Sequence, residues 1–444
     1  MAIDFTYRLQ IPHSPGQLAK VATAIGDAEG LIGDVRTINI GREASIREIT
    51  VETRDQAQAE RISALLDDLD GVSVRWFRDR ALIRHEGGKL SMDPIEPVQS
   101  VQDLRDIYTP GVARVSSAIA EDAGLAARYT MIGRSVGICT NGTRMLGLGD
   151  IGPVASMPVM EGKAVFYRQF AGISAMPILI DTHDVDEFVD TVIHIAPTFG
   201  GIHLEDISAP ECFEIEARLI EALPQPVMHD DVHGTVVVTL AAAIVACRQA
   251  GLILKDTVVG QIGLGAAGFG IAGLMVDGGV ERVIAFDPNE LSHERARARG
   301  IEVTDIATLM AEAQVVVATT GRPGTITPDM ISPGQVIMAL TNPTPEIYPE
   351  EALAAGAAFA SDGRSINNVI GYPGIFRGAL QAGASAINQE MKLAAAWAIA
   401  GLTVESELVP DVLDPSVHES VAAAVREAAL ESGVGHLERA PAGL

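Results

Sequence analysis

Two pairs of adjacent carboxylates are the residues best suited to chemistry in this sequence. Glu205-Asp206 and Asp230-Asp231 each follow an apolar segment that is predicted to be a strand. Adjacent carboxylates raise each other's pKa unless a cation lies among them, and Mg²⁺ and Mn²⁺ prefer such oxygen-rich ligand sets. One pair alone would be interpreted as a helix cap or a solvated loop. Two pairs together predict a divalent metal site.

Lys163 is a candidate general base. It lies in the segment VMEGKAVFYRQFAG, where it is predicted to follow a Glu-Gly turn and to precede an apolar helix. A metal ion nearby would lower the pKa of this lysine, and Asp230 or Asp231 would orient it. The alternative is that Lys163 is an ordinary solvated lysine.

Tyr108 and Arg144 are two further candidates. Tyr108 precedes a Thr-Pro-Gly turn and, from spacing alone, is better interpreted as a core tyrosine. Residues 140–153 are predicted to form a strand, a turn and a strand, with Arg144 just past the hairpin. An arginine there suits bidentate binding of a substrate carboxylate, although most arginines at such turns face water.

A glycine-rich loop between a predicted strand and a predicted helix indicates dinucleotide binding. Gly263 permits the tight turn, Gly265 lets the backbone approach a pyrophosphate, and Gly268 lets the helix pack closely on the strand. Ala266 and Ala267 complete the start of the helix, whose free N–H groups and positive dipole end attract phosphates.

Asp287 ends the next predicted strand, at residues 280–288. Its carboxylate can accept hydrogen bonds from both ribose hydroxyls and would repel a 2′-phosphate, which favours NAD over NADP. Arg295 and Arg297 lie not far downstream and keep NADP open. The alternative is that Asp287 and the proline after it only begin a turn.

The elements that position these residues alternate between helix and strand. After a buried helix at residues 234–251, strands are predicted at 280–288, 313–321, 335–342 and 357–363, with helical segments between them. Such alternation is typical of a parallel sheet. We therefore expect an α/β protein with a Rossmann-type domain and a C-terminal amphipathic helix that docks on the catalytic half.

Residues 3–79 are predicted to form a unit of their own. Their element order is β-α-β-β-α-β, as in a ferredoxin-like fold, and residues 84–97, rich in Gly, Pro and polar side chains, form the boundary. With Pro15-Gly16 at the entry to the first helix, the unit resembles the amino-acid-binding regulatory (ACT) domain. The resemblance implies pairing and a small effector near Ser14–Leu18. The alternative is a packing or dimerisation module without a ligand.

Composition excludes several classes of protein. The chain has 444 residues, 48% apolar and 20% charged, which is unlike a disordered, collagen-like or coiled-coil protein. Its formal net charge of −26 argues against nucleic-acid and membrane partners. No apolar run is expected to span a bilayer, and the N-terminus lacks the pattern of a signal peptide. Cys139, Cys212 and Cys247 are interpreted as buried thiols in a reducing compartment. We therefore expect a cytoplasmic protein.

A set of motifs occurs together and in order over about residues 84–400: YTPGVA, LGLGDIGP, MEGKAVFY, LEDISAP, HDDVHGT, GLGAAG, LTNPTPEI and INNVIGYPGIFRGAL. As a set they resemble the bacterial malic enzymes, which oxidatively decarboxylate L-malate to pyruvate and CO₂ with NAD(P)⁺ and Mg²⁺ or Mn²⁺. The N-terminal unit is not part of the minimal family pattern and resembles an appended regulatory domain.

The resemblance implies a role for each matching residue of the acidic site. The residues in the positions of the family's metal ligands are Glu205, Asp206 and Asp231. Its general base corresponds to Lys163, and Asp230 corresponds to the neighbour that adjusts the pKa of this lysine and orients it. Its general acid corresponds to Tyr108. In the implied reaction Lys163 takes the proton of the C2 hydroxyl as hydride leaves for NAD, CO₂ is lost, and Tyr108 protonates C3.

The resemblance also implies the substrate contacts. Arg144 corresponds to the arginine that binds the substrate carboxylate, a position that many short bacterial members do not fill with arginine. Asn342 and Asn368 resemble the asparagines that contact substrate and nicotinamide. A homodimer is implied as well, in which Tyr108 can reach the partner's site.

Three domains are expected: an ACT-like regulatory domain at 1–80, a substrate and catalytic domain at 81–233 completed by 369–444, and a Rossmann-type NAD-binding domain at 234–368. The expected function is NAD-linked oxidative decarboxylation of L-malate with Mg²⁺ or Mn²⁺. Two alternatives stay open. One is a malolactic or simple malate dehydrogenase activity, and the other is a catalytically silent metabolite-sensing protein.

Overall fold

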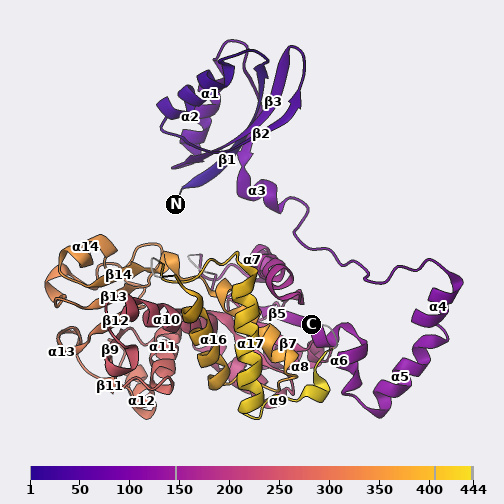
Figure 1. Cartoon of the computed structure of the whole chain (residues 1–444), viewed down its shortest axis with the longest axis vertical. Coiled ribbons are helices and arrows are strands. Elements are labelled where there is room, and N and C mark those ends of the chain that lie inside the picture. Colours follow the sequence, from indigo (N-terminus) through magenta and orange to yellow (C-terminus); the bar gives the residue numbers. More distant parts are fainter. Residues whose placement is uncertain (1, 146–147, 405–406, 442–444) are drawn as a thin grey trace. The chain divides into compact units, whose positions relative to one another are not determined.

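Two compact units, Met1–Ser91 and Met92–Leu444, make up the chain. The computed structural model describes residues 2–145, 148–404 and 407–441, and each unit has its own sheet or sheets and its own buried core (Figure 1).

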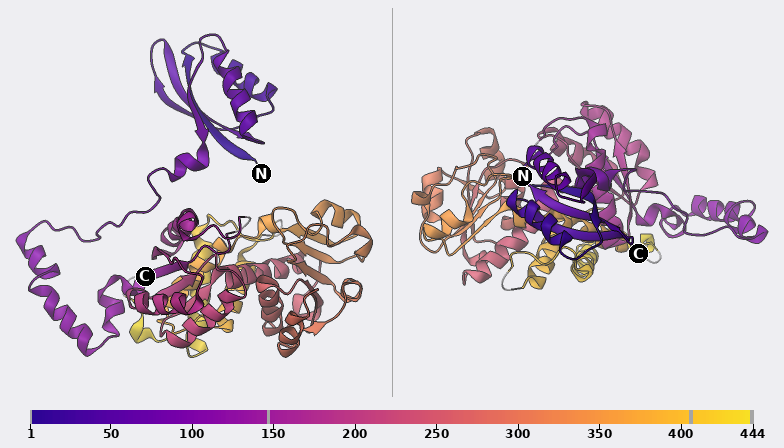
Figure 2. Two further views of the ribbon diagram at one scale, coloured as in Figure 1. Left: turned by 180° about the vertical axis from the view of Figure 1, so that it is seen from behind. Right: turned by 90° about the horizontal axis from the view of Figure 1, so that it is seen from above.

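The N-terminal unit is a four-stranded antiparallel sheet, in the order β2-β3-β1-β4, with both of its long helices on one face (Figures 1 and 2). Alternate residues of the central strand, Phe5, Tyr7, Leu9 and Ile11, are buried because they face those helices. The elements have the predicted β-α-β-β-α-β order: β1 (Ile3–Pro12), α1 (Gln17–Asp27), β2 (Leu31–Ile40), β3 (Ala44–Thr53), α2 (Gln56–Asp67) and β4 (Ser73–Asp79). The assignment of an ACT-like regulatory role stays a prediction.

Short helices lead from this sheet into the second unit. They are α3 (Arg80–His85), α4 (Val101–Ile107), α5 (Gly111–Glu121) and α6 (Leu125–Tyr129). Helices α4 and α5 contact each other and expose much of their apolar surface, including Leu104, Ile107 and Val112.

The second unit begins with a parallel four-stranded sheet in the order β6-β5-β7-β8. Its elements are β5 (Ser135–Thr140), α7 (Pro153–Phe166), β6 (Ser174–Leu179), α8 (Val185–Ile195), β7 (Gly201–Leu204), α9 (Glu211–Ala222) and β8 (Val227–His229). The first acidic pair follows β7 and the second follows β8, as predicted. Because the strands are parallel, both pairs lie at the same edge of the sheet.

Two local predictions in this region are wrong. Residues 140–153 do not form a hairpin: among their described residues, β5 ends at Thr140 and only an isolated bridge joins Met145 to Gly149, while residues 146 and 147 lie outside the described part. Lys163 does not follow a turn, because α7 continues through Glu161 and Gly162. Tertiary burial of one face of α7 overrides the local turn signal.

Helix α10 (Asp230–Gln249) connects the two sheets of the second unit in sequence. It begins at Asp230 rather than at residue 234, so both carboxylates of the second pair lie in its first turn. It is also the one helix in the described residues that is long and apolar enough to cross a membrane, which contradicts the expectation that no such run exists. Most of this helix is buried because it packs on α11 and α16, as a core helix does.

The remaining sheet is parallel and six-stranded, in the order β11-β10-β9-β12-β13-β14. This confirms the predicted α/β class with a Rossmann-like sheet. The elements are β9 (Val258–Ile262), α11 (Ala266–Asp277), β10 (Arg282–Phe286), α12 (Leu291–Ala298), β11 (Glu302–Val303), α13 (Ile306–Glu312), β12 (Val315–Ala318), β13 (Val336–Ala339), α14 (Pro349–Ala354) and β14 (Phe359–Asp362).

Three helices complete the second unit: α15 (Tyr372–Gln381), α16 (Gln389–Leu402) and α17 (Pro415–Glu431). Both α15 and α16 pack on α17, whose Val421 and Val425 are fully buried, so the predicted docked C-terminal helix is confirmed. The interpretation of the three cysteines as buried free thiols is also confirmed.

Candidate active site

Three carboxylates converge at the ends of β7 and β8. One oxygen from each of Glu205, Asp206 and Asp231 lies within 4.8 Å of the other two. The backbone N–H of Asp206 donates to Asp231 Oδ2 at 3.0 Å, which ties the two acidic pairs together. Asp206 has a φ of 53°, in the left-handed region that non-glycine residues rarely adopt. Asp206 Oδ2 is buried and has no hydrogen-bond partner among the described residues.

The electrostatics of this cluster fit a divalent cation. Burial first, and then the charge of Asp231, raises the pKa of Glu205 to about 8. Burial, Glu205 and Asp231 together raise the pKa of Asp206 to about 8. Hard cations such as Mg²⁺ take carboxylate oxygens, and an unpartnered buried oxygen at Asp206 is a free ligand position. The three residues therefore fit the predicted metal site, and their role as ligands stays a prediction.

Lys163 lies beside the same cluster. Its Nζ is 2.6 Å from Asp230 Oδ2 and 3.0 Å from Glu205 Oε1, and the ring of Tyr372 lies 4.7 Å from Nζ. Burial acts to lower the pKa of Lys163, but Asp230 and Glu205 outweigh it and raise that pKa well above its usual range. A divalent ion among the carboxylates would oppose this rise, because it would neutralise the charges that cause it.

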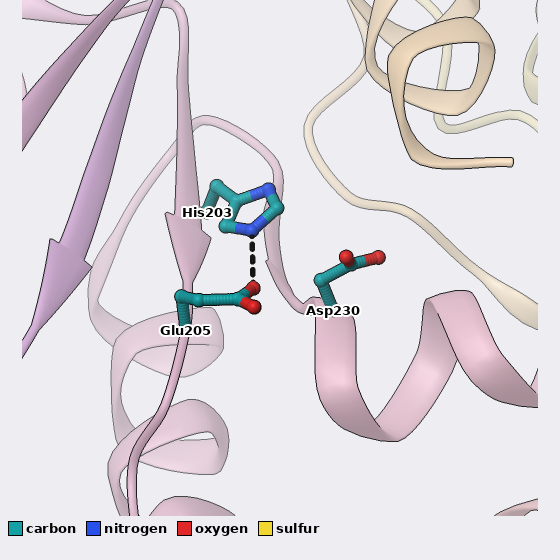
Figure 3. Close-up of side chains that lie close together, drawn as sticks. All are labelled: His203, Glu205 and Asp230. Carbon is teal, nitrogen blue, oxygen red and sulfur yellow. Dashed lines mark hydrogen bonds and ion pairs between the residues drawn. The ribbon is translucent and has the colours of Figure 1, made fainter. Parts of the chain in front are cut away.

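A second group of possible ligands, His203, Glu205 and Asp230, overlaps the first. His203 Nε2 lies 2.8 Å from Glu205 Oε2, within hydrogen-bond distance. Figure 3 shows the two residues on one chain segment, with Asp230 opposite at the start of α10. The ammonium group of Lys163 already bridges Glu205 and Asp230. This group is therefore better interpreted as a network around the lysine than as a second metal site.

Two hydrogen-bond donors hold the Asp230 carboxylate, and a nearby glycine leaves room for it. Its Oδ2 accepts from Lys163 Nζ and from Asn368 Nδ2, both at 2.6 Å. A Cβ on Gly234, one turn further along α10, would lie 1.9 Å from Asp230 Oδ1. The Asp230 carboxylate can therefore occupy its place only because residue 234 has no side chain.

Of the two further candidates, Arg144 lies beside the acidic cluster and Tyr108 does not. The backbone N–H of Arg144 donates to the carbonyl of Asp206 at 3.1 Å, and the charge of Arg144 acts to lower the pKa of Asp206 against the larger effect of burial. Tyr108 follows α4 directly and is 66% exposed. The described contacts of a single chain bring Arg144 to the acidic site and do not bring Tyr108 there.

The glycine-rich loop follows β9, where the strand order of the six-stranded sheet reverses direction. Gly263 has a φ of 92°, and a Cβ there would lie 2.9 Å from the carbonyl oxygen of Thr319. Gly265 precedes the first residue of α11, which is Ala266. Asp287 Oδ2 accepts a hydrogen bond from the N–H of Leu264 at 2.6 Å, so this carboxylate stabilises the conformation of the loop. Ligands bind at such switch points of parallel sheets.

Asn342 lies on the exposed loop after β13. A second carboxylate, that of Glu346, connects this loop to its neighbour. Buried Glu346 accepts from the backbone N–H of Thr320 at 2.7 Å and from that of Thr341 at 3.1 Å. It thereby joins the loops that follow β12 and β13. These loops lie at the same edge of the sheet as the glycine-rich loop, which is where the nicotinamide half of a dinucleotide would be held.

Sequence reasoning missed Glu346, Gly234, His203 and the aromatic residues around Lys163. The histidine left a usable signal, because residues two apart in a strand share a face and His203 precedes Glu205 by two. The other contacts join segments far apart in the sequence. No local pattern reports them.

The fold and this geometry define an α/β protein whose second unit has two parallel sheets, one of them Rossmann-like, and a buried lysine–carboxylate centre. The family model for the malic enzyme N-terminal domain matches residues 88–220, and that for the acetohydroxy acid isomeroreductase NADPH-binding domain matches residues 253–339. The chain is 52% identical to NAD-dependent malic enzyme 1 of Bacillus subtilis, over 96% of this chain and 97% of that protein.

Two further comparisons agree. The chain is 41% identical to the bifunctional malic/malolactic enzyme of Bacillus subtilis, over 81% of this chain and 95% of that one. The crystal structure of malic enzyme from Pyrococcus horikoshii superposes with a TM-score of 0.75 and 38% identity, covering 80% of this chain and 91% of that one. The chain belongs to the malic enzyme family, and it is an oxidoreductase.

The raised carboxyl pKa values predict that stabilisation by Mg²⁺ grows with pH. In the unfolded chain Glu and Asp titrate near 4, whereas Glu205 and Asp206 titrate at about 8 in the folded metal-free protein. Between these pH values the folded state holds protons that the unfolded state has lost, so the free energy of unfolding of the metal-free protein falls as pH rises. Mg²⁺ bound at the predicted ligands would displace those protons.

The measurement is the rise in Tm caused by a fixed Mg²⁺ concentration between about pH 6 and about pH 8.5. We expect it to increase up to about pH 8, where the carboxyl groups of Glu205 and Asp206 ionise. The double variant Glu205→Gln/Asp206→Asn should show no such increase. An equal Mg²⁺ effect at the two ends of this pH range would contradict the assignment.

Proposed function

We propose that this chain catalyses the oxidative decarboxylation of L-malate to pyruvate and CO₂, with reduction of NAD⁺ and with Mg²⁺ or Mn²⁺ bound. The observation that carries the proposal is the contact of Lys163 with Asp230 and Glu205 beside a three-carboxylate cluster. The resemblance to the NAD-dependent malic enzyme of Bacillus subtilis supports the choice of substrate and cofactor.

In this proposal Glu205, Asp206 and Asp231 would hold the metal ion, which would supply Lewis-acid stabilisation of negative charge on the substrate. Lys163, in its neutral form, would accept the proton of the C2 hydroxyl, and NAD⁺ held at the glycine-rich loop would supply the hydride acceptor. Asp230 holds the Lys163 amine in place, since their atoms lie 2.6 Å apart. Arg144 binds a carboxylate of L-malate. Its backbone N–H donates to the Asp206 carbonyl, and this position beside the acidic cluster supports that role.

In this proposal the cofactor binds to the Rossmann-like part of the second unit. Gly263, Gly265, Ala266, Ala267 and Gly268 receive the pyrophosphate at the start of α11, and Asp287 receives the adenosine ribose. Asn342 and Asn368 lie on the nicotinamide side. The carboxylate of Asp287, already within hydrogen-bond distance of the loop, disfavours a 2′-phosphate and supports NAD over NADP.

These roles go with the three domains expected from the sequence, the first of which lies within the compact unit Met1–Ser91. Residues 1–80 form a regulatory domain, residues 81–233 with 369–444 form the catalytic domain, and residues 234–368 form the NAD-binding domain. The free, buried thiols support a cytoplasmic location, because disulfides are rare in reducing compartments.

The chain acts as a homodimer in this proposal, and Tyr108 protonates C3 in the partner's site. Two observations support it. Tyr108 is exposed in a single chain, and the adjoining helices α4 and α5 leave Leu104, Ile107 and Val112 exposed. An amphipathic helix pair with an open apolar face buries that face against another protein surface.

The N-terminal unit binds a small effector and pairs with a second copy. A cavity of about 430 Å³ lies at the loop before α1, lined by residues 11–19, Ser45 and Arg47. Gln17 Oε1 at this loop is buried without a partner among the described residues. The edge strand β2 is exposed along its whole length, so its free backbone groups are available for pairing.

Deleting residues 1–80 is expected to abolish any response of malate turnover to effectors, because the cavity is removed while the catalytic unit is left intact. Initial rates with a panel of amino acids and central metabolites measure this. In the full chain, Arg47→Ala should weaken the response and leave the rate without effector unchanged. A truncated enzyme that responds like the full chain would exclude the regulatory role.

Product analysis tests the function itself. With L-malate, NAD⁺ and Mn²⁺, pyruvate and NADH should form in equal amounts. Lactate without net NADH would indicate a malolactic activity, which the resemblance to the bifunctional malic/malolactic enzyme makes the second candidate. Accumulated oxaloacetate would indicate a simple dehydrogenase, and no turnover would indicate a silent sensing protein.

A further inference from the structure

A short chain of hydrogen bonds runs behind Glu205. The hydroxyl group of Tyr167 lies 2.8 Å from His203 Nδ1, and His203 Nε2 lies 2.8 Å from Glu205 Oε2. The side chains of Tyr167 and His203 are completely buried. Tyr167 lies directly after α7, the helix that carries Lys163, and His203 lies in β7 two residues before Glu205. Figure 3 shows the imidazole facing the carboxylate.

The partners of the histidine fix its tautomer. An ionised carboxylate can only accept a hydrogen bond, so His203 Nε2 must carry the hydrogen when Glu205 is charged. Nδ1 is then an acceptor, and the Tyr167 hydroxyl group donates to it. Tyr167 thereby selects the tautomer in which His203 donates to Glu205.

Aromatic rings hold the imidazole in this orientation. Its ring centroid lies 5.4 Å from that of Tyr372 and 5.7 Å from that of Phe376, with the Phe376 ring inclined by only 28° to it. Both aromatic residues belong to α15 and are buried. The histidine cannot rotate without displacing this packing.

The two oxygens of the Glu205 carboxylate therefore have different partners. Oε2 accepts from His203, while Oε1 faces Lys163 Nζ at 3.0 Å. When a hydrogen bond fixes one oxygen of a carboxylate, the other oxygen points in a single direction. Groups behind a ligating side chain commonly set its orientation in this way.

We propose that His203, held by Tyr167, is a positioning residue that directs Glu205 Oε1 toward the metal ion and Lys163. The proposal deepens the proposed function and rests on it for the identity of Glu205 as a metal ligand. It assigns no proton transfer to His203, because the chain of hydrogen bonds ends at buried Tyr167.

The test measures Mn²⁺ binding directly, by the electron paramagnetic resonance signal of free Mn²⁺. His203→Leu removes the donor and is expected to weaken Mn²⁺ binding about 10- to 100-fold. His203→Gln retains an N–H near the position of Nε2 and should recover most of the affinity. His194→Leu, a change at an exposed histidine on α8, should have no effect.

Tyr167→Phe keeps the ring and removes only the hydroxyl group, so it tests the tautomer without a large change in packing. We expect it to weaken Mn²⁺ binding several-fold. NADH binding, followed by fluorescence, should be unchanged in all four variants because the Rossmann-like half is untouched. If His203→Leu does not fold, Tyr167→Phe and His203→Gln decide the question.

Wild-type Mn²⁺ affinity in folded His203→Leu, or in Tyr167→Phe where the former does not fold, would overturn the proposal. Equal losses in His203→Gln and His203→Leu would also overturn it, since they would indicate a packing role. If the wild-type enzyme binds Mn²⁺ but does not convert malate, the proposed function fails while the positioning role is still decided by the affinities.

Discussion

Lys163→Ala is expected to reduce kcat for NADH formation from L-malate by about 10³-fold, within the range of general acid–base contributions. The amine is buried between Asp230 and Glu205 and contacts both carboxylates. Alanine leaves no base there. It also leaves two buried carboxylates without their counter-charge, so a divalent ion should bind at least as tightly as before.

The control variant is Lys255→Ala, which changes an exposed lysine before β9. It should behave as wild type in turnover, NADH binding and Mn²⁺ binding. For Lys163→Ala, NADH binding should survive because the glycine-rich loop is unaffected. Turnover within a few-fold of wild type would exclude Lys163 as the base.

Gly234→Ala is expected to cause a loss of turnover of about 10²-fold or more, since small misplacements at reacting groups cost this much in rate. Residue 234 itself carries no chemistry. The new methyl group would lie 1.9 Å from Asp230 Oδ1 and 3.2 Å from Asn368 Cβ. The Asp230 carboxylate must move, and its contacts with Lys163 and Asn368 are lost.

Gly401→Ala is the matched control, since this glycine lies in α16 and an added Cβ would meet nothing within 4 Å. It should leave turnover unchanged and leave the Tm equal or slightly higher, because alanine favours the helix. The two glycine variants thus separate steric displacement of Asp230 from the general effect of alanine in a helix. Equal turnover in both would contradict the role of Gly234.

The sheet of the N-terminal unit and the six-stranded sheet were predictable from the sequence because their signals are local. The alternation of apolar strands with helices around Gly263 and Asp287 predicts a parallel sheet, and the six-stranded sheet has this form. The acidic pairs were found in the same way, since each directly follows a buried strand. Parallel pairing then brings strand ends together without any long-range information.

The environment of Lys163 was not predictable in this way. The Glu-Gly pair before it suggests a turn, yet Ser156, Met160 and Lys163 are buried at helical spacing on one face of α7. Reading that longer period would have placed the lysine correctly. The contacts with Asp230, Asn368 and Tyr372 come from other segments, so only the folded chain reveals them.

The left-handed backbone at Asp206 has a practical consequence for mutagenesis. Asparagine adopts this conformation readily, whereas for alanine it costs about 1–2 kcal/mol. Asp206→Asn therefore removes only the charge, while Asp206→Ala also disturbs the path of the main chain. Any experiment that compares metal ligands at this position by alanine substitution alone would confuse electrostatics with conformation.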